Sequence, residues 1–290
     1  MAKLEELFTG KLYSIQKKVK EKTGADLKIA FDDLQSNTQY SVNGTKPGWA
    51  ASMIKIPVLI ATFRAIDAGR LSLEDELSID HRFTLDPTSE ISYRQQGSTA
   101  TVTELANYMI LASCNESTNM LADRIGIPFI NSTMQELNCS ATRMSHLIYQ
   151  MAPLEDPGID GTSSNTTTAE EMTSLMKRIY RSELASPASC TRMRQILEND
   201  PALEYGRASV NHFLQASLPR GTLVGAKCGV LGDDIMETGV INGDYALTVM
   251  LNKLSSAAGG AGVISAISEA VYQRYYHDQL PSVNGDRERV

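Results

Sequence analysis

Three short motifs in the chain carry residues that could transfer an acyl group to a serine. In order, they are Ser52-Met53-Ile54-Lys55, Ser113-Cys114-Asn115 and Lys227-Cys228-Gly229. A serine hydroxyl becomes a strong nucleophile when a neighbouring base takes its proton, and a second serine can carry protons onward. Because matches to each motif also occur singly elsewhere in the chain, we identify the relevant set by the order of the three motifs and by their sequence context. The spare matches are Ser14 to Lys17, Ser174 to Lys177, Ser117 to Asn119, Ser209 to Asn211 and Lys22-Thr23-Gly24.

The segment around Ser52 favours a catalytic role for this serine. Residues 50–61 are almost wholly apolar apart from Ser52 and Lys55, which predicts a buried helix. At a spacing of three residues, the two side chains share one helix face. Burial lowers the pKa of a lysine, so that its neutral amine can take a proton from a nearby hydroxyl. Pro57 is best tolerated near a helix start, which places Ser52 close to backbone N–H groups that can stabilise an oxyanion.

The other two motifs lie at the ends of predicted secondary-structure elements. Residues 101–104 form a capping-box pattern that begins a helix, and Ser113 follows the last apolar residues of that helix. Ser113 and Asn115 could also be helix-capping residues, and the sequence is compatible with either role. Residues 221–226 predict a strand that leads into Lys227.

The spare matches have simpler interpretations. Lys22-Thr23-Gly24 follows a lysine-rich helical stretch and predicts a helix that ends at a glycine. The pairs Ser14–Lys17 and Ser174–Lys177 lie in amphipathic patterns typical of surface helices.

Length and composition predict an enzyme-sized protein. The 290 residues, of which 42% are hydrophobic, can form one large domain or two closely joined domains. A net charge of −7 disfavours nucleic acid or an anionic membrane as the main partner. No cluster of Cys and His has metal-ligand spacing, so we expect no metal and no cofactor. The sequence predicts no membrane helix and no signal peptide, which indicates a cytoplasmic protein or the mature part of a trimmed precursor.

The strand patterns lie at both ends of the chain, around a helical middle. Asn242-Gly243 predicts a two-residue hairpin between the last two strands. Because one sheet must combine both ends, we predict an α/β (α+β) fold with an antiparallel five-stranded sheet, flanked by terminal helices and interrupted by an inserted all-helical subdomain. The sheet subdomain is expected over 1–47 and 198–290, the helical subdomain over 48–197, and the active site at their junction. The predicted strands are residues 27–32, 39–42, 222–230, 236–241 and 245–251, and the terminal helices are residues 3–22 and 259–275.

These motifs resemble those of the penicillin-recognising serine hydrolases, and most of all class A β-lactamases. The resemblance extends over nearly the whole chain and includes residues 51–57, 101–119 and 165–172. In the last block, Thr168 and Glu171 also match an ordinary capping box. The resemblance implies a serine β-lactamase-like fold and hydrolysis through an acylated serine.

The resemblance also implies a role for each site residue. By this resemblance, Ser52 is the nucleophile and Lys55 is its activating base. Ser113 relays a proton to the leaving group, with Lys227 beside it. Backbone N–H groups of Ser52 and Val230 would form the oxyanion hole. The implied substrate-binding residues are Asn115, Cys228, Gly229 and Val230.

The chain departs from the family in the loop that should supply the deacylation base. Class A enzymes use a glutamate a few residues after a Thr-Arg pair, whereas here residues 144–149, which follow Thr142-Arg143, contain no carboxylate. Ile148 stands about where the acid is expected. Without a general base, water attack on the acyl-serine loses about 10²–10⁴-fold in rate. The loop is longer than in the family, and its acids come later, at Glu155, Asp156 and Asp160.

Further departures affect substrate binding. Cysteine occupies the middle position of two motifs, as Cys114 and Cys228, and a thiol is a weak donor to a carboxylate. The strand where the family often has an arginine contains Glu237 instead, with Asp233 and Asp234 before it. These changes predict weak binding of an anionic penicillin.

Three functions fit the sequence. The favoured one is a serine acyl-enzyme hydrolase of the class A β-lactamase type, acting on a β-lactam or a related amide or ester with poor deacylation. The second is a penicillin-binding D,D-peptidase or acyltransferase, of which a serine glutaminase is a weaker variant. The third is a non-catalytic scaffold that binds a ligand or partner. The first two take a small-molecule or peptide substrate and no nucleic acid, and the sequence leaves the oligomeric state open.

Overall fold

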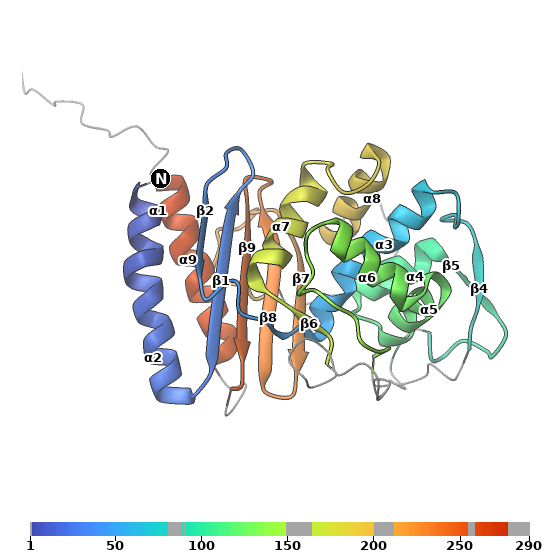
Figure 1. Ribbon diagram of the computed structural model, residues 1–290, viewed down its shortest axis with the longest axis horizontal. Helices are drawn as coiled ribbons and strands as arrows, with labels where there is room; N and C mark the ends of the chain where they lie inside the picture. Colours follow the sequence, from blue (N-terminus) through green and yellow to red (C-terminus); the bar gives the residue numbers. More distant parts are fainter. Residues whose placement is uncertain are drawn as a thin grey trace, which may run out of the picture.

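The chain forms an antiparallel five-stranded sheet with helices packed on both faces (Figure 1). The computed structural model describes residues 2–80, 89, 91–148, 164–199, 212–254 and 259–277. The α+β fold class predicted from the sequence is confirmed. The strands lie in the order β2-β1-β9-β8-β7, with β1 at Asp26–Asp33, β2 at Gln39–Val42, β7 at Val224–Leu231, β8 at Asp234–Ile241 and β9 at Tyr245–Asn252.

The sheet joins segments from both ends of the chain, as predicted. Strand β1 pairs with β9 over its full length, from Asp26 opposite Asn252 to Asp33 opposite Tyr245. Asn242 and Gly243 both have positive φ, 51° and 73°, as a two-residue hairpin turn between β8 and β9 requires.

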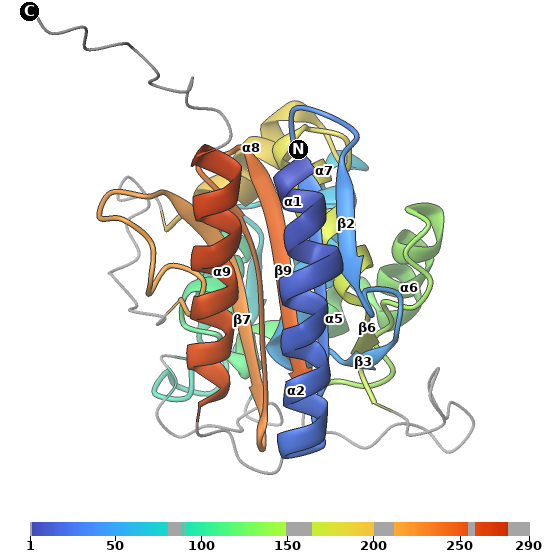
Figure 2. The ribbon, with the colours of Figure 1, turned by 90° about the vertical axis from the view of Figure 1, so that its left-hand side faces the viewer.

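Helices from the two ends of the chain cover one face of the sheet (Figure 2). The N-terminal helix continues through a π-helical segment, and Gly24 ends it with a φ of 71°. The helix and its glycine stop were predicted correctly, whereas the π-helical segment was not. The elements are α1 (Ala2–Glu6), η1 (Leu7–Leu12), α2 (Tyr13–Thr23) and α9 (Gly260–His277).

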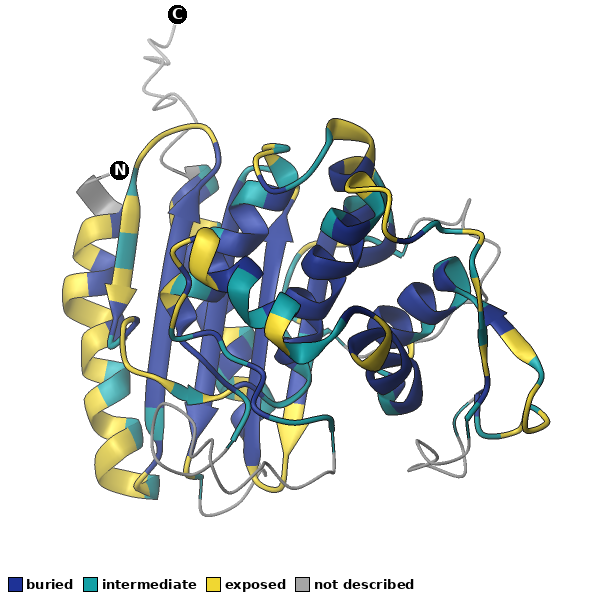
Figure 3. Ribbon diagram, turned by 45° about the vertical axis from the view of Figure 1, so that its right-hand side comes forward, coloured by how far each residue is buried: buried dark blue, intermediate teal, exposed yellow. Residues whose placement is uncertain are grey.

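The opposite face of the sheet packs against a helical layer with its own core (Figure 3). In helix α3 (Lys55–Asp67), every residue from Lys55 to Phe63 is buried. The predicted subdomain boundaries stay a prediction. None of the helices in the described ranges is long and apolar enough to cross a bilayer. The other elements of this layer are β3 (Gly48–Trp49), η2 (Ala51–Ile54), β4 (Glu76–Ser78), β5 (Thr99–Thr101), α4 (Val102–Leu111), α5 (Asn115–Ile125), α6 (Ile127–Glu136), β6 (Thr166–Thr167), α7 (Ala169–Tyr180) and α8 (Pro187–Leu197).

Two local predictions about this layer need correction. Lys177 is buried rather than on the surface, because its amine pairs with the Asp32 carboxylate of β1 at 2.5 Å. Thr168 does accept the backbone N–H of Glu171, but the Glu171 carboxylate bonds Ala141 N and Thr142 Oγ1 instead of closing a capping box. By contrast, the capping box predicted at Thr101 is complete.

Candidate functional site

Ser52 lies in the 3₁₀ turn Ala51–Ile54, which runs directly into α3. This is the position near a helix start that Pro57 predicts. Ala51 has a φ of 42°, in the left-handed region that residues other than glycine rarely adopt. The fold therefore holds the backbone beside Ser52 in a strained conformation, which is common at functional sites.

The Lys55 amine is buried among four oxygen atoms. Ser113 O and Asn115 Oδ1 lie 2.7 and 2.8 Å from Nζ, and both can only accept hydrogen bonds. The Oγ atoms of Ser52 and Ser113 each lie 3.0 Å away. A neutral amine has two N–H groups for the first two oxygens and one lone pair left for a hydroxyl proton. Burial and the charge of Lys227 hold the pKa of Lys55 well below its usual value, so the amine can serve as a base toward Ser52.

Ser113 links the two buried lysines. Its Oγ lies 3.0 Å from Lys55 Nζ and 3.0 Å from Lys227 Nζ. Burial lowers the pKa of Lys227, whose amine also donates to the Cys228 carbonyl. Because the Ser113 hydroxyl contacts both lysine amines, it can pass a proton between either amine and a group bound near Ser52.

In the second motif, Ser113-Cys114-Asn115, the residue that caps the helix is not one of the two that the sequence favours for this role. Cys114, rather than Ser113 or Asn115, is the N-cap of α5, and its sulfur accepts the N–H of Ser117 at 3.4 Å. The thiol lies 3.4 Å from a carboxylate oxygen of Glu116, and burial raises its pKa. Cys114 therefore supports the helix, while its two neighbours contact Lys55.

Strand β7 passes very close to the backbone of Ser52. A Cβ atom added to Gly229 would lie 3.0 Å from Ser52 N and 3.1 Å from Ala51 Cβ, so a larger residue would push the strand away. The next two residues, Val230 and Leu231, are 53% and 42% exposed. Glycine at position 229 thus allows this strand to form one wall of the site.

Ser52 opens into a cavity of about 190 Å³. Asn115 and Val230, both predicted as site residues, line it together with the apolar side chains of Trp49 and Leu231. The loop after Arg143 supplies a further wall through His146 and Ile148. A mostly apolar cavity that also contains a few polar groups suits a small organic acyl group.

Two asparagines fix the loop wall, and the sequence analysis missed both of them. Asn119 accepts the N–H of Ile148 at 2.8 Å and donates to its carbonyl at 3.1 Å. Asn165 Oδ1 accepts the N–H groups of Ser145 and His146, and Asn165 Nδ2 donates to the His146 carbonyl. The available signal for Asn119 was its place four residues after Asn115, on the same face of α5.

The structure does not place the acidic residues noted in the sequence in the cavity at Ser52 among its described residues. Glu155, Asp156 and Asp160 lie outside the described residues. Glu237 pairs with Cys228 across the β7–β8 ladder, but its buried carboxylate accepts the N–H of Leu214 and contacts His212 Nδ1 at 2.8 Å. No three His, Cys, Asp or Glu side chains in the described ranges could hold a metal ion.

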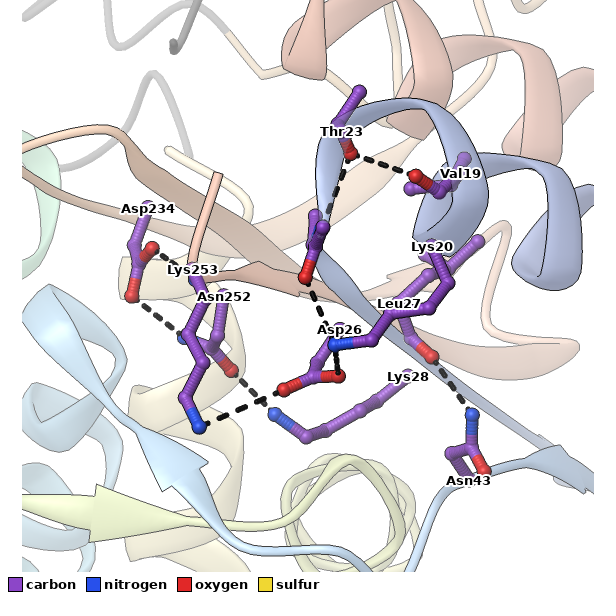
Figure 4. Close-up of polar contacts among 12 residues, drawn as sticks. Val19, Lys20, Thr23, Asp26, Leu27, Lys28, Asn43, Asp234, Asn252 and Lys253 are labelled. Atoms are coloured by element: carbon purple, nitrogen blue, oxygen red, sulfur yellow. Dashed lines mark hydrogen bonds and ion pairs between the residues drawn. The ribbon is translucent and has the colours of Figure 1, made fainter. Parts of the chain in front are cut away.

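A polar network joins Lys28 of β1, Asp234 of β8 and Asn252 of β9 (Figure 4). Asn252 accepts from Lys28 Nζ at 2.6 Å and donates to the Asp234 carboxylate at 3.1 Å and to the Trp49 carbonyl at 3.4 Å. Burial lowers the pKa of Lys28 to about 8. A side chain at Gly48 would overlap the Asn252 oxygen, so this network also depends on glycine. It ties the Trp49 backbone to the end of the sheet where β8 begins.

The chain matches a family model described as the β-lactamase enzyme family over residues 11–275. Among solved structures, it is similar to PBP-A, with 27% identity, a TM-score of 0.79, and coverage of 92% of this chain and 97% of that chain. It is also similar to a leucine-to-glutamate variant of PBP-A in acyl-enzyme complex with penicillin G (28% identity, TM-score 0.78, 91% and 95% coverage). A β-lactamase from Sphaerobacter thermophilus shares the fold at 23% identity, with a TM-score of 0.77 and coverage of 93% and 98%.

Proposed function

The chain belongs to the β-lactamase enzyme family, and we propose that it cleaves a β-lactam or a related amide or ester through an acyl-Ser52 intermediate, with slow deacylation. The observation that carries this proposal is the environment of Lys55. Its buried amine contacts Ser52 Oγ and Ser113 Oγ at 3.0 Å while two obligate acceptors take its N–H groups. This arrangement supports proton removal from Ser52 by the Lys55 amine, whose pKa burial holds well below its usual value.

In the proposed acylation step, Ser52 Oγ gives its proton to Lys55 and bonds to the carbonyl carbon of the substrate. The negative charge on the carbonyl oxygen is stabilised by the backbone N–H groups of Ser52 and Val230. The bond from carbon to the leaving nitrogen or oxygen then breaks, and Ser113 protonates the leaving atom. Ser113 recovers a proton from Lys55, since its Oγ contacts that amine, and Lys227 stabilises the hydroxyl during the transfer.

The proposal of slow deacylation depends on Ile148. Class A β-lactamases, which this chain resembles, have a carboxylate in this loop, whereas here an aliphatic side chain faces the cavity beside Ser52. Without a strong general base, hydrolysis of an acyl-enzyme by water is about 10²–10⁴-fold slower. The same observation favours a second function, a penicillin-binding D,D-peptidase or acyltransferase, in which an amine rather than water accepts the acyl group. The penicillin G acyl-enzyme of the PBP-A variant supports penicillin as an acylating probe for both functions.

A non-catalytic scaffold is less consistent with the site. Lys55 and Lys227 are both 0% exposed, and burying an amine that has no partner carboxylate is costly. Binding alone gives no reason to maintain two such groups around one serine hydroxyl.

The experiment that tests the proposed function follows a chromogenic cephalosporin in a rapid-mixing assay. We expect a burst close to one equivalent of product, followed by a slow steady state, because acylation is fast and deacylation is slow. Absence of a burst and of turnover would overturn the proposal. Release of D-alanine from a peptide that ends in D-Ala-D-Ala, faster than cephalosporin turnover, would select the D,D-peptidase.

A further inference from the structure

His146 is the only ionisable side chain among the described residues that line the cavity at Ser52. It lies two residues before Ile148, in the loop wall that lacks the expected carboxylate. The other described lining groups are apolar, hydroxyl or amide side chains, which do not accept a proton near neutral pH. If this cavity contains a base for water, His146 is the candidate that the structure supplies.

The hydrogen bond of the ring determines which nitrogen is available. His146 Nδ1 lies 2.8 Å from the carbonyl oxygen of Leu147, and a carbonyl can only accept. The proton of the neutral ring is therefore on Nδ1, which leaves a lone pair on Nε2. No described residue forms a hydrogen bond with Nε2. The ring thus has the tautomer that a general base requires.

The loop holds this ring at a fixed place. Asn165 bonds both the N–H and the carbonyl of His146, at 3.3 and 3.2 Å. Asn119 holds both backbone groups of Ile148. The cavity volume of about 190 Å³ corresponds to a few waters, because one water occupies about 30 Å³ in the liquid. A short water chain can therefore connect His146 to an acyl group on Ser52.

We propose that His146 is the general base for the slow hydrolysis of acyl-Ser52 that remains in the absence of the loop carboxylate, an inference that rests on the proposed function. The attacking water gives one proton to Nε2, and its oxygen bonds to the acyl carbon. Lys55, which is neutral after acylation, takes the proton of the imidazolium through the cavity water and passes it to Ser52 Oγ. The bond between the acyl carbon and Oγ breaks as Oγ receives this proton. Free serine and a carboxylic acid result, and no cofactor or oxidant takes part.

The test measures acylation and deacylation separately in the whole chain. Penicillin G is added in single-turnover amounts, and intact mass spectrometry follows the appearance and decay of the adduct. In His146→Ala we expect the adduct to form as in the parent and to decay about 10²-fold more slowly. His146→Gln provides a second variant that retains a polar side chain.

Added imidazole gives a readout that a purely structural role would not change. It should accelerate adduct decay in His146→Ala, and pyrazole, a ring of similar shape with far lower basicity, should not. His212→Ala is the control, because this histidine contacts Glu237 and does not line the cavity. Its adduct should decay at the parental rate.

The two proposals fail in distinguishable ways. If the parent forms no adduct and has no turnover, the proposed function fails and His146 has no acyl-enzyme to act on. If the adduct forms but decays equally fast in the parent, His146→Ala and His146→Gln, only the role of His146 is overturned. A slower decay in Glu155→Gln together with a parental decay in His146→Ala would likewise overturn this role.

Discussion

Replacing Lys55 by arginine separates a lysine that acts as a base from one that only supplies charge. Arginine stays protonated at every working pH, so it cannot take the proton of Ser52. Lys55→Met keeps a chain of similar length and removes the amine altogether. Since neither variant has a neutral amine within 3.0 Å of Ser52 Oγ, we expect acylation to fall by about 10²–10⁴-fold in each.

The lowered pKa of Lys55 also fixes the sign of a stability effect. The unfolded chain keeps this lysine protonated up to about pH 10.5, whereas the folded chain releases the proton at a lower pH. Between these two pKa values the unfolded state binds more protons, so the free energy of unfolding rises with pH. The rise should be shallower in Lys55→Met. It should not vanish, because burial also lowers the pKa of Lys227.

The assay is the cephalosporin burst, measured against pH, together with urea unfolding at each pH. Lys17→Met is a matched control, because Ser14 and Lys17 have the same spacing on an exposed stretch of α2. It should leave both the burst rate and its pH dependence unchanged. A Lys55→Arg variant that acylates at close to the parental rate would refute the reasoning that Lys55 is the base.

Three further predictions concern the walls of the site and the polar network of Asn252. Ile148→Glu should shorten the lifetime of the acyl adduct, by up to about 10²-fold, because it places a carboxylate in the cavity with Ser52; an unchanged lifetime in the mass assay would contradict the role given to this wall. Gly229→Ala should slow acylation and lower the free energy of unfolding by about 1–3 kcal/mol, since its Cβ would meet Ser52 N at 3.0 Å. A parental burst rate would show that β7 can shift freely. Asn252→Ala should lower stability in urea by about 1–3 kcal/mol, because it leaves buried polar groups of Lys28 and Asp234 without this partner; an unchanged stability would contradict this role.

The sequence predicted the sheet and the central pair of the site because these depend on local patterns. Alternating strands and the Asn242-Gly243 turn predict the hairpins directly. Ser52 and Lys55 stand out because they are the polar residues in an otherwise apolar helical segment.

The remaining features depend on contacts between distant segments. Lys177 has an amphipathic surrounding sequence, yet it is buried because Asp32 lies opposite it on β1. The clamp that Asn119 forms on Ile148 joins residues 29 positions apart. The capping role of Cys114 was also hidden, because cysteine is an uncommon N-cap and its neighbours Ser113 and Asn115 match that role better in sequence. Local propensity cannot show such pairings.

The central claim is that Ser52 carries the acyl group. Intact mass spectrometry of the parent, Ser52→Ala and Cys228→Ala after exposure to penicillin G tests it most directly. We predict an adduct of one intact penicillin on the parent and on Cys228→Ala, and none on Ser52→Ala. Cys228 is the relevant rival because it is the cysteine next to Lys227. Burial raises the pKa of its thiol, which disfavours the reactive thiolate and supports Ser52. An adduct that persists in Ser52→Ala and disappears in Cys228→Ala would contradict the serine mechanism.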